Sequence, residues 1–298
     1  MYNLKLYYIF TILILYFLII HTLKKNNKIK EQLTTTNNSN RFLLNHILKT
    51  NSENNIKILY IVGVENSIRN IALLENNYEI LKNKHSLDWC FNHFDGDNSL
   101  WKNEKWYDNL NCTKNTKKGT KVIQWLNITP EIALDYDYLW FVDGDIGLEK
   151  FNYDSYYKML DKFKPLLSQP SVASHTLLGK SSDWPHLRYE HQFRNTIHIC
   201  DKNIEVQTPF ISTKVWNLIY EKLKLTNPIS IWETELFYNN LIYDLNQIKF
   251  INFTSAVIHH DFKNLTSNNK DLKKARMLYK SPDPDNYDEK VLAIKKIL

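Results

Sequence analysis

Two aspartates that follow a hydrophobic run are the residues best suited to do chemistry. Residues 138–142 read Tyr-Leu-Trp-Phe-Val and lead directly into Asp143-Gly144-Asp145. The run has the length and aromatic content of a buried strand, which predicts that both carboxylates lie at the carboxyl edge of a sheet, where α/β proteins bind ligands. Two carboxylates on a glycine turn can hold one hard cation, Mg²⁺ or Mn²⁺, which can bridge a diphosphate. The alternative is a strand-end turn with solvated acids.

A second Asp-Gly-Asp sequence, at residues 95–97, competes with the first as a metal site. The segment before it, residues 87–94, alternates apolar and polar side chains, which is typical of a half-exposed strand. The strand before Asp143 is apolar throughout. We therefore favour Asp143 and Asp145 as the metal ligands.

The elements around these motifs alternate between strand and helix. Strand patterns occur at residues 56–64, 87–94, 138–142 and 166–170, and helical patterns at residues 68–82, 121–125 and 154–163. Such alternation predicts an α/β fold whose central, mainly parallel sheet is flanked by helices. The polypeptide of 298 residues, 43% of them hydrophobic, is long enough for one main domain after a separate N-terminal segment.

The distribution of basic residues along the chain argues against nucleic acid as a partner. The formal net charge is +6, but its basic residues form no stripe interleaved with aromatic side chains, and no nucleic-acid-binding motif is visible. A mildly positive balance suits a phosphate-bearing substrate. The three cysteines fit no Cys-x-x-Cys metal pattern.

The N-terminal segment predicts a membrane anchor. After a tail of residues 1–5, residues 6–23 are almost entirely apolar and are followed by several lysines, without the small residues of a signal-peptide cleavage site. The short span suits a thin bilayer such as that of the endoplasmic reticulum or early Golgi. Lysines after the span favour a cytosolic domain, whereas Lys5 and the free amine favour the opposite orientation. We assign residues 24–54 to a polar stem, 55–275 to the folded domain and 276–298 to a C-terminal tail helix.

Eight short motifs occur in a particular order along the folded domain. They are residues 62–64 (VGV), 93–96 (HFDG), 136–145 (ending in DGD), 148–151 (LEKF), 168–170 (SQP), 209–212 (PFIS, with Trp216), Trp232 with Glu235, and 257–259 (VIH). In this order they resemble the domain family of unknown function 707, which is related to nucleotide-sugar glycosyltransferases of the GT-A fold. This chain has Gly144 between the aspartates, where the family usually has an acid, and Glu233 and Glu235 where it favours Gly and often Asp.

The resemblance implies a GT-A-like fold and a metal-dependent transfer of a sugar from a nucleotide-diphosphate sugar to a hydroxyl of a glycan or glycoprotein. It implies His259 as the third ligand to Mn²⁺ or Mg²⁺, with His260 in reserve, although either could be an ordinary core or surface histidine. Attack by the acceptor calls for a carboxylate base, for which we choose Glu235. Glu235 could instead be a helix N-terminal acid, or could position the acceptor if the reaction retains configuration.

Further residues are candidates for contacts with the donor and the acceptor. Val62 and Gly63 at the first strand's end, with Asn66 and Arg69 beyond it, could hold base and ribose, and Lys121 could approach the phosphates. Contacts with sugar or acceptor are predicted for Gln169, Trp184, His186 and Arg188. Ordinary loop polarity explains each of them equally well.

Two other classes of function fit parts of the pattern. A haloacid-dehalogenase-type phosphatase also has a strand followed by Asp-x-Asp, but it expects Thr or Val where Gly147 stands. The second is a catalytically degenerate, membrane-tethered protein of the same fold that binds a glycan or a nucleotide. The resemblance favours the glycosyltransferase, with a single-pass type II topology and the domain in the lumen of the Golgi or endoplasmic reticulum.

Overall fold

The computed structural model describes residues 55–84, 86–174, 185–225 and 231–260. The expected anchor, stem and tail helix lie outside these residues. Within them, no helix is both long and apolar enough to cross a bilayer.

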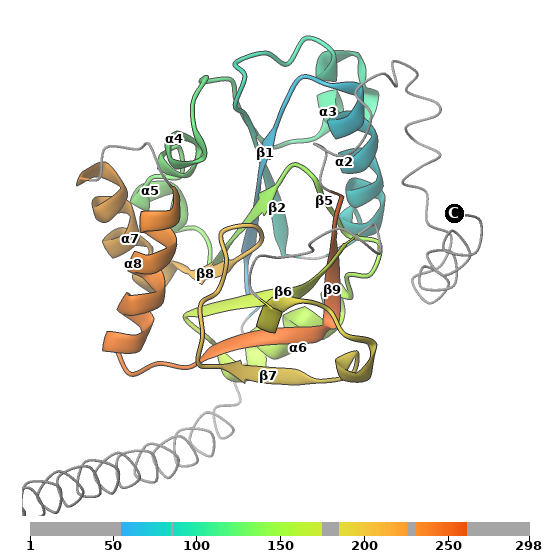
Figure 1. Cartoon of the computed structure of the whole chain (residues 1–298). Coiled ribbons are helices and arrows are strands. Elements are labelled where there is room, and N and C mark those ends of the chain that lie inside the picture. Colours follow the sequence, from blue (N-terminus) through green and yellow to red (C-terminus); the bar gives the residue numbers. More distant parts are fainter. Residues whose placement is uncertain (1–54, 85, 175–184, 226–230, 261–298) are drawn as a thin grey trace, which may run out of the picture. The chain divides into compact units, whose positions relative to one another are not determined.

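Strands and helices alternate along most of the described chain (Figure 1). The strands are β1 (Ile58–Val64), β2 (Leu87–His93), β3 (Thr113–Asn115), β4 (Tyr138–Asp143), β5 (Ile146–Gly147), β6 (Leu167–Ser174), β7 (Ile197–Cys200), β8 (Phe210–Ser212) and β9 (Lys249–His259). The helices are α2 (Ile68–Leu81), α3 (Lys105–Asn109), α4 (Lys121–Leu126), α5 (Pro130–Ala133), α6 (Tyr153–Phe163), α7 (Thr213–Leu225) and α8 (Ile231–Asp244), with short 3-10 turns η1 (Trp101–Asn103), η2 (Pro185–Leu187) and η3 (His191–Phe193).

The strands form one mixed sheet in the order β3-β2-β1-β4-β8-β6-β9-β5, and β7 also pairs with β9. The longest pairings, β1 with β2, β1 with β4 and β6 with β9, are parallel. Strands β8, β5 and β7 join by shorter antiparallel pairings. The α/β fold with helices on a mainly parallel sheet is thus confirmed, with antiparallel insertions that the sequence did not predict.

Two hydrophobic clusters cover the two faces of the sheet. Tyr60 and Trp140 belong to a cluster with residues of α2 and α6, whereas Leu59 and Phe141 belong to a cluster with α4, α7 and α8. Successive side chains of β1 and β4 point to opposite faces, so both strands need apolar residues at every position. This arrangement explains the unbroken apolar run before Asp143.

One expectation about the sheet was wrong. Strand β2 is buried from Trp89 to His93, whereas its alternating sequence predicted a half-exposed strand. The reason is that β2 lies between β1 and β3, and its polar side chains have partners inside the protein. The side chain of His93 bonds to Tyr107 at 2.8 Å, and Asn92 accepts hydrogen bonds from Asn115 and Asn127.

Candidate active site

A cavity of about 460 Å³ opens at the carboxyl ends of β1 and β4. The parallel register pairs Gly63 with Asp143, so the two strands end side by side. Of the residues predicted from the sequence, five line this cavity: Gly63, Arg69, Lys121, Asp143 and Asp145. Parallel strands converge at one edge of a sheet, and this geometry gathers side chains from four separate loops and helices at one point.

Lys121, the first residue of α4, forms an ion pair with Asp143, and the Nζ and Oδ1 atoms are 2.5 Å apart. The same ammonium group donates a hydrogen bond to the carbonyl of Val206 at 3.3 Å. Burial raises the pKa of Asp143, and the charge of Asp145 adds to this rise, while Lys121 opposes it. The neighbouring cation therefore favours the charged form of this buried carboxylate.

Asp145 meets His259 across 114 residues of sequence, with 3.2 Å between Oδ2 and Nε2. Pairing of β5 with β9 sets Ile146 opposite His259, and the backbone N–H of His260 donates to the carbonyl of Asp145. Burial acts to raise the pKa of Asp145, but the hydrogen bond and charge of His259 outweigh it and leave that pKa below its ordinary value. The side chain of His260 instead bonds to buried Glu149 at 2.9 Å.

The donor set fits a hard divalent cation. Two carboxylates and one imidazole are ligands that Mn²⁺ accepts, and a cation would favour the charged form of Asp143, which burial disfavours. Asp143, Asp145 and His259 would hold such a cation. In the described part of the chain, however, no three His, Cys, Asp or Glu side chains are grouped closely enough to bind one without moving. The Asp143 carboxylate is instead directed at Lys121.

Helix α2 holds the Asp-Gly-Asp turn in place through two buried asparagines. The side chain of Asn70 donates to the carbonyl of Gly144 at 2.8 Å and accepts from the backbone N–H of Glu65 at 2.6 Å. Two helical turns later, Asn77 donates to the carbonyl of Ile146 and accepts from the N–H of Leu148. Residues seven apart lie on the same face of a helix, so both amides reach the same segment.

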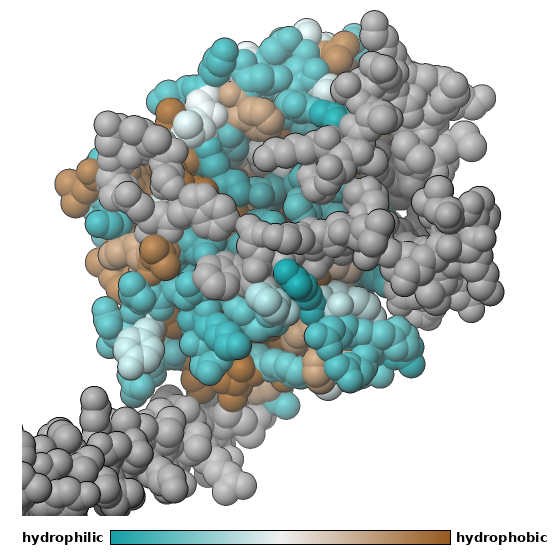
Figure 2. Space-filling model, in the orientation of Figure 1, coloured by the Kyte–Doolittle hydropathy of each residue, from teal (hydrophilic) through white to brown (hydrophobic). Residues whose placement is uncertain are grey.

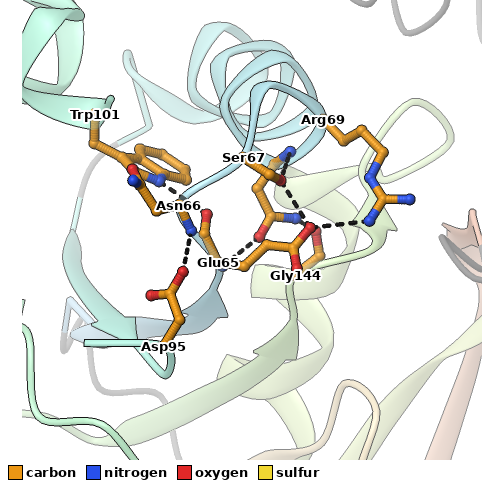
Figure 3. A network of polar contacts seen from close by, with 8 residues as sticks. Glu65, Asn66, Ser67, Arg69, Asp95, Trp101 and Gly144 are labelled. Carbon is orange, nitrogen blue, oxygen red and sulfur yellow. Dashed lines mark hydrogen bonds and ion pairs between the residues drawn. The ribbon is translucent and has the colours of Figure 1, made fainter. Parts of the chain in front are cut away.

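The first turn of α2 also orders the rim of the cavity (Figure 3). Ser67 caps the helix by accepting from the backbone N–H of Asn70, and its hydroxyl donates to Glu65. Arg69 forms an ion pair with Glu65 at 3.0 Å. At Gly144, a Cβ atom would lie 2.3 Å from the carbonyl oxygen of Gly63, so only glycine fits between the two strand ends.

The second Asp-Gly-Asp sequence fastens the loop after β2 to the loop after β1. Asp95 accepts a hydrogen bond from the backbone N–H of Asn66 at 2.6 Å, and Asp97 accepts one from the Asn66 side chain at 2.7 Å. These hydrogen bonds give Asp95, Asp97 and the Asn66 side chain a role in ordering the two loops. None of the three lines the cavity at Asp143.

Several predicted site residues lie away from this cavity. Val62 is fully buried within β1. Gln169 is buried in β6 and accepts from the N–H of Glu205 at 2.9 Å. His186 bonds through Nε2 to the carbonyl of Asn203, and Arg188 follows η2. Trp184 and the side chain of Glu233 lie outside the described part of the structure.

Glu235 is buried on α8, and one of its carboxylate oxygens accepts from the backbone N–H of Val206 at 3.1 Å. It does not line the cavity, but it is linked to it, because the carbonyl of Val206 accepts from Lys121. Its role as the base therefore stays a prediction.

Sequence reasoning missed four polar residues that line the cavity: Glu65, Asn70, Thr120 and Gln124. For Asn70 a signal exists, because an asparagine on the apolar face of a helix needs a buried partner. Gln124 donates to the carbonyl of Gly119 and packs closely over Gly63. Nothing in the local sequence around Glu65 or Gln124 distinguishes them from ordinary surface residues.

Comparison with known proteins gives one family and one solved structure to report. Residues 24–281 match the family described as "Protein of unknown function (DUF707)". No curated protein matches. The solved structure is S. aureus TarS 1-349, which is 14% identical, with a TM-score of 0.46. The match covers 69% of this chain and 60% of the length of that chain. With more than four fifths of its length matched, the chain belongs to the DUF707 family.

Proposed function

We propose that this protein is a metal-dependent glycosyltransferase with a GT-A-like fold, which moves a sugar from a nucleotide-diphosphate sugar to a hydroxyl group of a glycan or glycoprotein. One observation carries the proposal: a single cavity at the ends of two parallel strands contains both carboxylates of the Asp-Gly-Asp turn and the cations Lys121 and Arg69. Two acids for a metal and two cations for phosphates are the groups that a departing nucleoside diphosphate requires.

The charged side chains of the cavity other than Glu65, which pairs with Arg69, have roles in this reaction. Asp143 and Asp145, with His259 behind Asp145, would hold Mn²⁺ or Mg²⁺. Bound there, the metal would act as a Lewis acid that neutralises the diphosphate. Lys121, which already contacts Asp143 and the Val206 carbonyl, would bind a phosphate oxygen, as would Arg69, which also lines the cavity.

The acceptor hydroxyl must lose a proton, and we retain Glu235 as the proposed base. In the structure its carboxylate accepts a hydrogen bond from the N–H of Val206, and the carbonyl of Val206 accepts one from Lys121. This observation also favours a second candidate function. A base that is 1% exposed and bonded to backbone fits the catalytically degenerate protein, which would bind a nucleotide or glycan without turnover.

The N-terminal residues complete the proposal. We propose that residues 6–23 anchor the protein as a single-pass type II membrane protein, that residues 24–54 form its stem, and that residues 55–275 act in the lumen of the Golgi or endoplasmic reticulum. Residues 276–298 are proposed as a peripheral tail helix. The basis is the hydropathy and charge of the sequence.

Thermal unfolding of the full-length protein in detergent tests the donor site. UDP, GDP and CMP would each be added with and without Mn²⁺, because a ligand that binds only the native state stabilises it by about 2.7 kcal/mol at one hundred times its Kd. We expect a rise in Tm with one nucleotide that requires Mn²⁺ and is lost in Asp143→Ala. The matched control is Asp244→Ala, at an exposed residue that ends α8.

Absence of a shift with every nucleotide would refute the donor site. A Mn²⁺-dependent shift without hydrolysis or transfer of the corresponding nucleotide sugar would favour the degenerate binding protein. Each variant is compared with its own ligand-free Tm, so that a change in intrinsic stability is not taken for a change in binding.

A further inference from the structure

A second cavity, of about 760 Å³, shares no residue with the cavity at Asp143. Four segments that are distant in sequence form it: the end of α2 with Lys84, residues 150–153 leading into α6, residues 189–195 around η3, and residues 253–256 of β9. Hydrophilic side chains gather in the part of the molecule where β7 and the residues before it lie (Figures 1 and 2).

The lining of this second cavity carries an excess of positive charge. Lys84, Lys150 and Arg194 contribute three cations, and the thirteen described lining residues include no carboxylate. Lys84 bonds to Asp154, which lies outside the lining, at 2.8 Å. Arg194 donates to Nε2 of His191 at 2.9 Å, so this contact leaves the Arg194 charge without a counter-charge from His191.

Aromatic rings and neutral hydrogen-bonding groups accompany the cations. The Lys150 ammonium lies 4.8 Å from the centre of the Tyr189 ring. Asn195 and Thr254 add amide and hydroxyl groups to the lining. A partly exposed tyrosine ring that can pack on the apolar face of a sugar, next to amides, a hydroxyl and cations, suits a carbohydrate with negative charges.

The position of this cavity ties it to the proposed reaction. Ala256 in its lining is three residues before His259 on β9, a separation of about 10 Å along a strand. Lys150 follows Asp145 by five residues on the neighbouring segment. On its β9 side, the second cavity therefore begins at a distance from His259 that a short oligosaccharide can span.

We propose that the second cavity binds an acidic oligosaccharide, with carboxylate, sulfate or phosphate groups, as the acceptor of the transfer. The role of this oligosaccharide as the acceptor rests on the proposed function, whereas its binding to the second cavity does not. A volume of about 760 Å³ is in the range of small-ligand sites and differs from the extended basic stripe that nucleic acids require.

Binding of size-matched probes to the full-length protein in detergent tests this proposal. The probes are a galacturonate hexasaccharide, a sulfated heparin hexasaccharide, neutral maltohexaose and the oligonucleotide dT6. We expect at least one acidic hexasaccharide to bind about tenfold or more tightly than maltohexaose, and its affinity to fall as salt rises. The double variant Lys150→Gln, Arg194→Gln should lose at least about tenfold in affinity for that glycan, because both residues line the cavity and supply its positive charge.

Two control variants make the test specific. Lys222→Gln, Lys224→Gln removes two charges from α7, outside the lining, and should change affinity by less than about twofold. The conservative double variant Lys150→Arg, Arg194→Lys should retain most of the binding if charge is what the site supplies. Equal affinity for maltohexaose, equal affinity for dT6, or an unchanged affinity of the charge-removing variant would each overturn the proposal.

The Asp143→Ala variant separates the two proposals. It should lose the nucleotide-dependent shift and keep binding of the acidic glycan, because the two cavities share no residue. Glycan binding in a protein that shows no nucleotide shift at all would support this site and refute the proposed transferase activity. Nucleotide binding in a protein that binds no acidic glycan would support the donor site and refute the proposal for the second cavity.

Discussion

Substitution of Asn77 tests whether helix α2 holds the Asp-Gly-Asp turn in its binding position. Asn77 is fully buried, and its side chain satisfies the carbonyl of Ile146 at 2.8 Å and the N–H of Leu148 at 2.9 Å. These two groups belong to the segment that directly follows Asp145. Replacing Asn77 by Leu keeps the approximate size of the side chain but removes both hydrogen bonds, as well as a longer one of 3.5 Å to the Tyr60 hydroxyl.

The expected cost follows from the groups left without a partner. Each buried backbone group that loses its hydrogen bond costs about 1–3 kcal/mol, or roughly 4 kcal/mol for the two. Burial of the leucine methyl groups returns about 2 kcal/mol. The net loss for Asn77→Leu is therefore about 2 kcal/mol, which corresponds to a fall in Tm of about 4–8 °C for a domain of this size.

Urea unfolding of the full-length protein in detergent measures this loss, with Asn76→Leu as the matched control. Asn76 precedes Asn77 on α2, and its buried Nδ2 has no hydrogen-bond partner within the described residues, so its replacement should change the free energy of unfolding by less than about 0.5 kcal/mol. A Tm shift with Mn²⁺ and nucleotide should also shrink in Asn77→Leu. Equal stability of the two variants would refute the role of Asn77 as a clamp.

Three further substitutions test other parts of the structure. Gly144→Ala should lower the free energy of unfolding by about 1–3 kcal/mol in urea, because the new Cβ meets the Gly63 carbonyl at 2.3 Å; unchanged stability would contradict that close approach. Burial lowers the pKa of His93 to about 4, so the unfolded chain binds more protons than the native protein between about pH 6.5 and 4. The free energy of unfolding therefore decreases as the pH is lowered through that window. His93→Gln should reduce this fall by about 2–3 kcal/mol between pH 7 and pH 4.5, and an identical fall in both proteins would show that another group causes it. Glu235→Gln keeps an oxygen that can accept from Val206, so nucleotide-induced shifts should persist while the transfer rate falls at least about 100-fold; an unchanged rate would exclude Glu235 as the base.

The strand-end site could be predicted from the sequence because its signal is local. An apolar run followed by Asp-Gly-Asp indicates both that the strand is buried on two faces and that its end carries acids. The structure indeed places Asp143, Asp145, Gly63, Lys121 and Arg69 around one cavity.

Residues inside elements were harder to assign. Gln169 and Glu235 have the polarity of site residues, and in the structure each accepts a hydrogen bond from a buried backbone N–H, of Glu205 and Val206 respectively. A polar side chain looks the same in the sequence whether its partner is a ligand or a peptide group. Which of these two partners the side chain has depends on the segment that packs next to it in the folded protein.

Local periodicity determined the strands β1, β2, β4 and β6 and the helices α2, α4 and α6, and so it determined that acids stand at the end of a buried strand. Tertiary structure decided which strands pair. The antiparallel addition of β5 to β9 brings His259 to Asp145, and no property of either segment alone specifies that pairing. The second cavity likewise exists only where four distant segments meet. Hydrophobic patterning encodes burial, residue by residue, whereas the choice of neighbours depends on the packing of the whole domain.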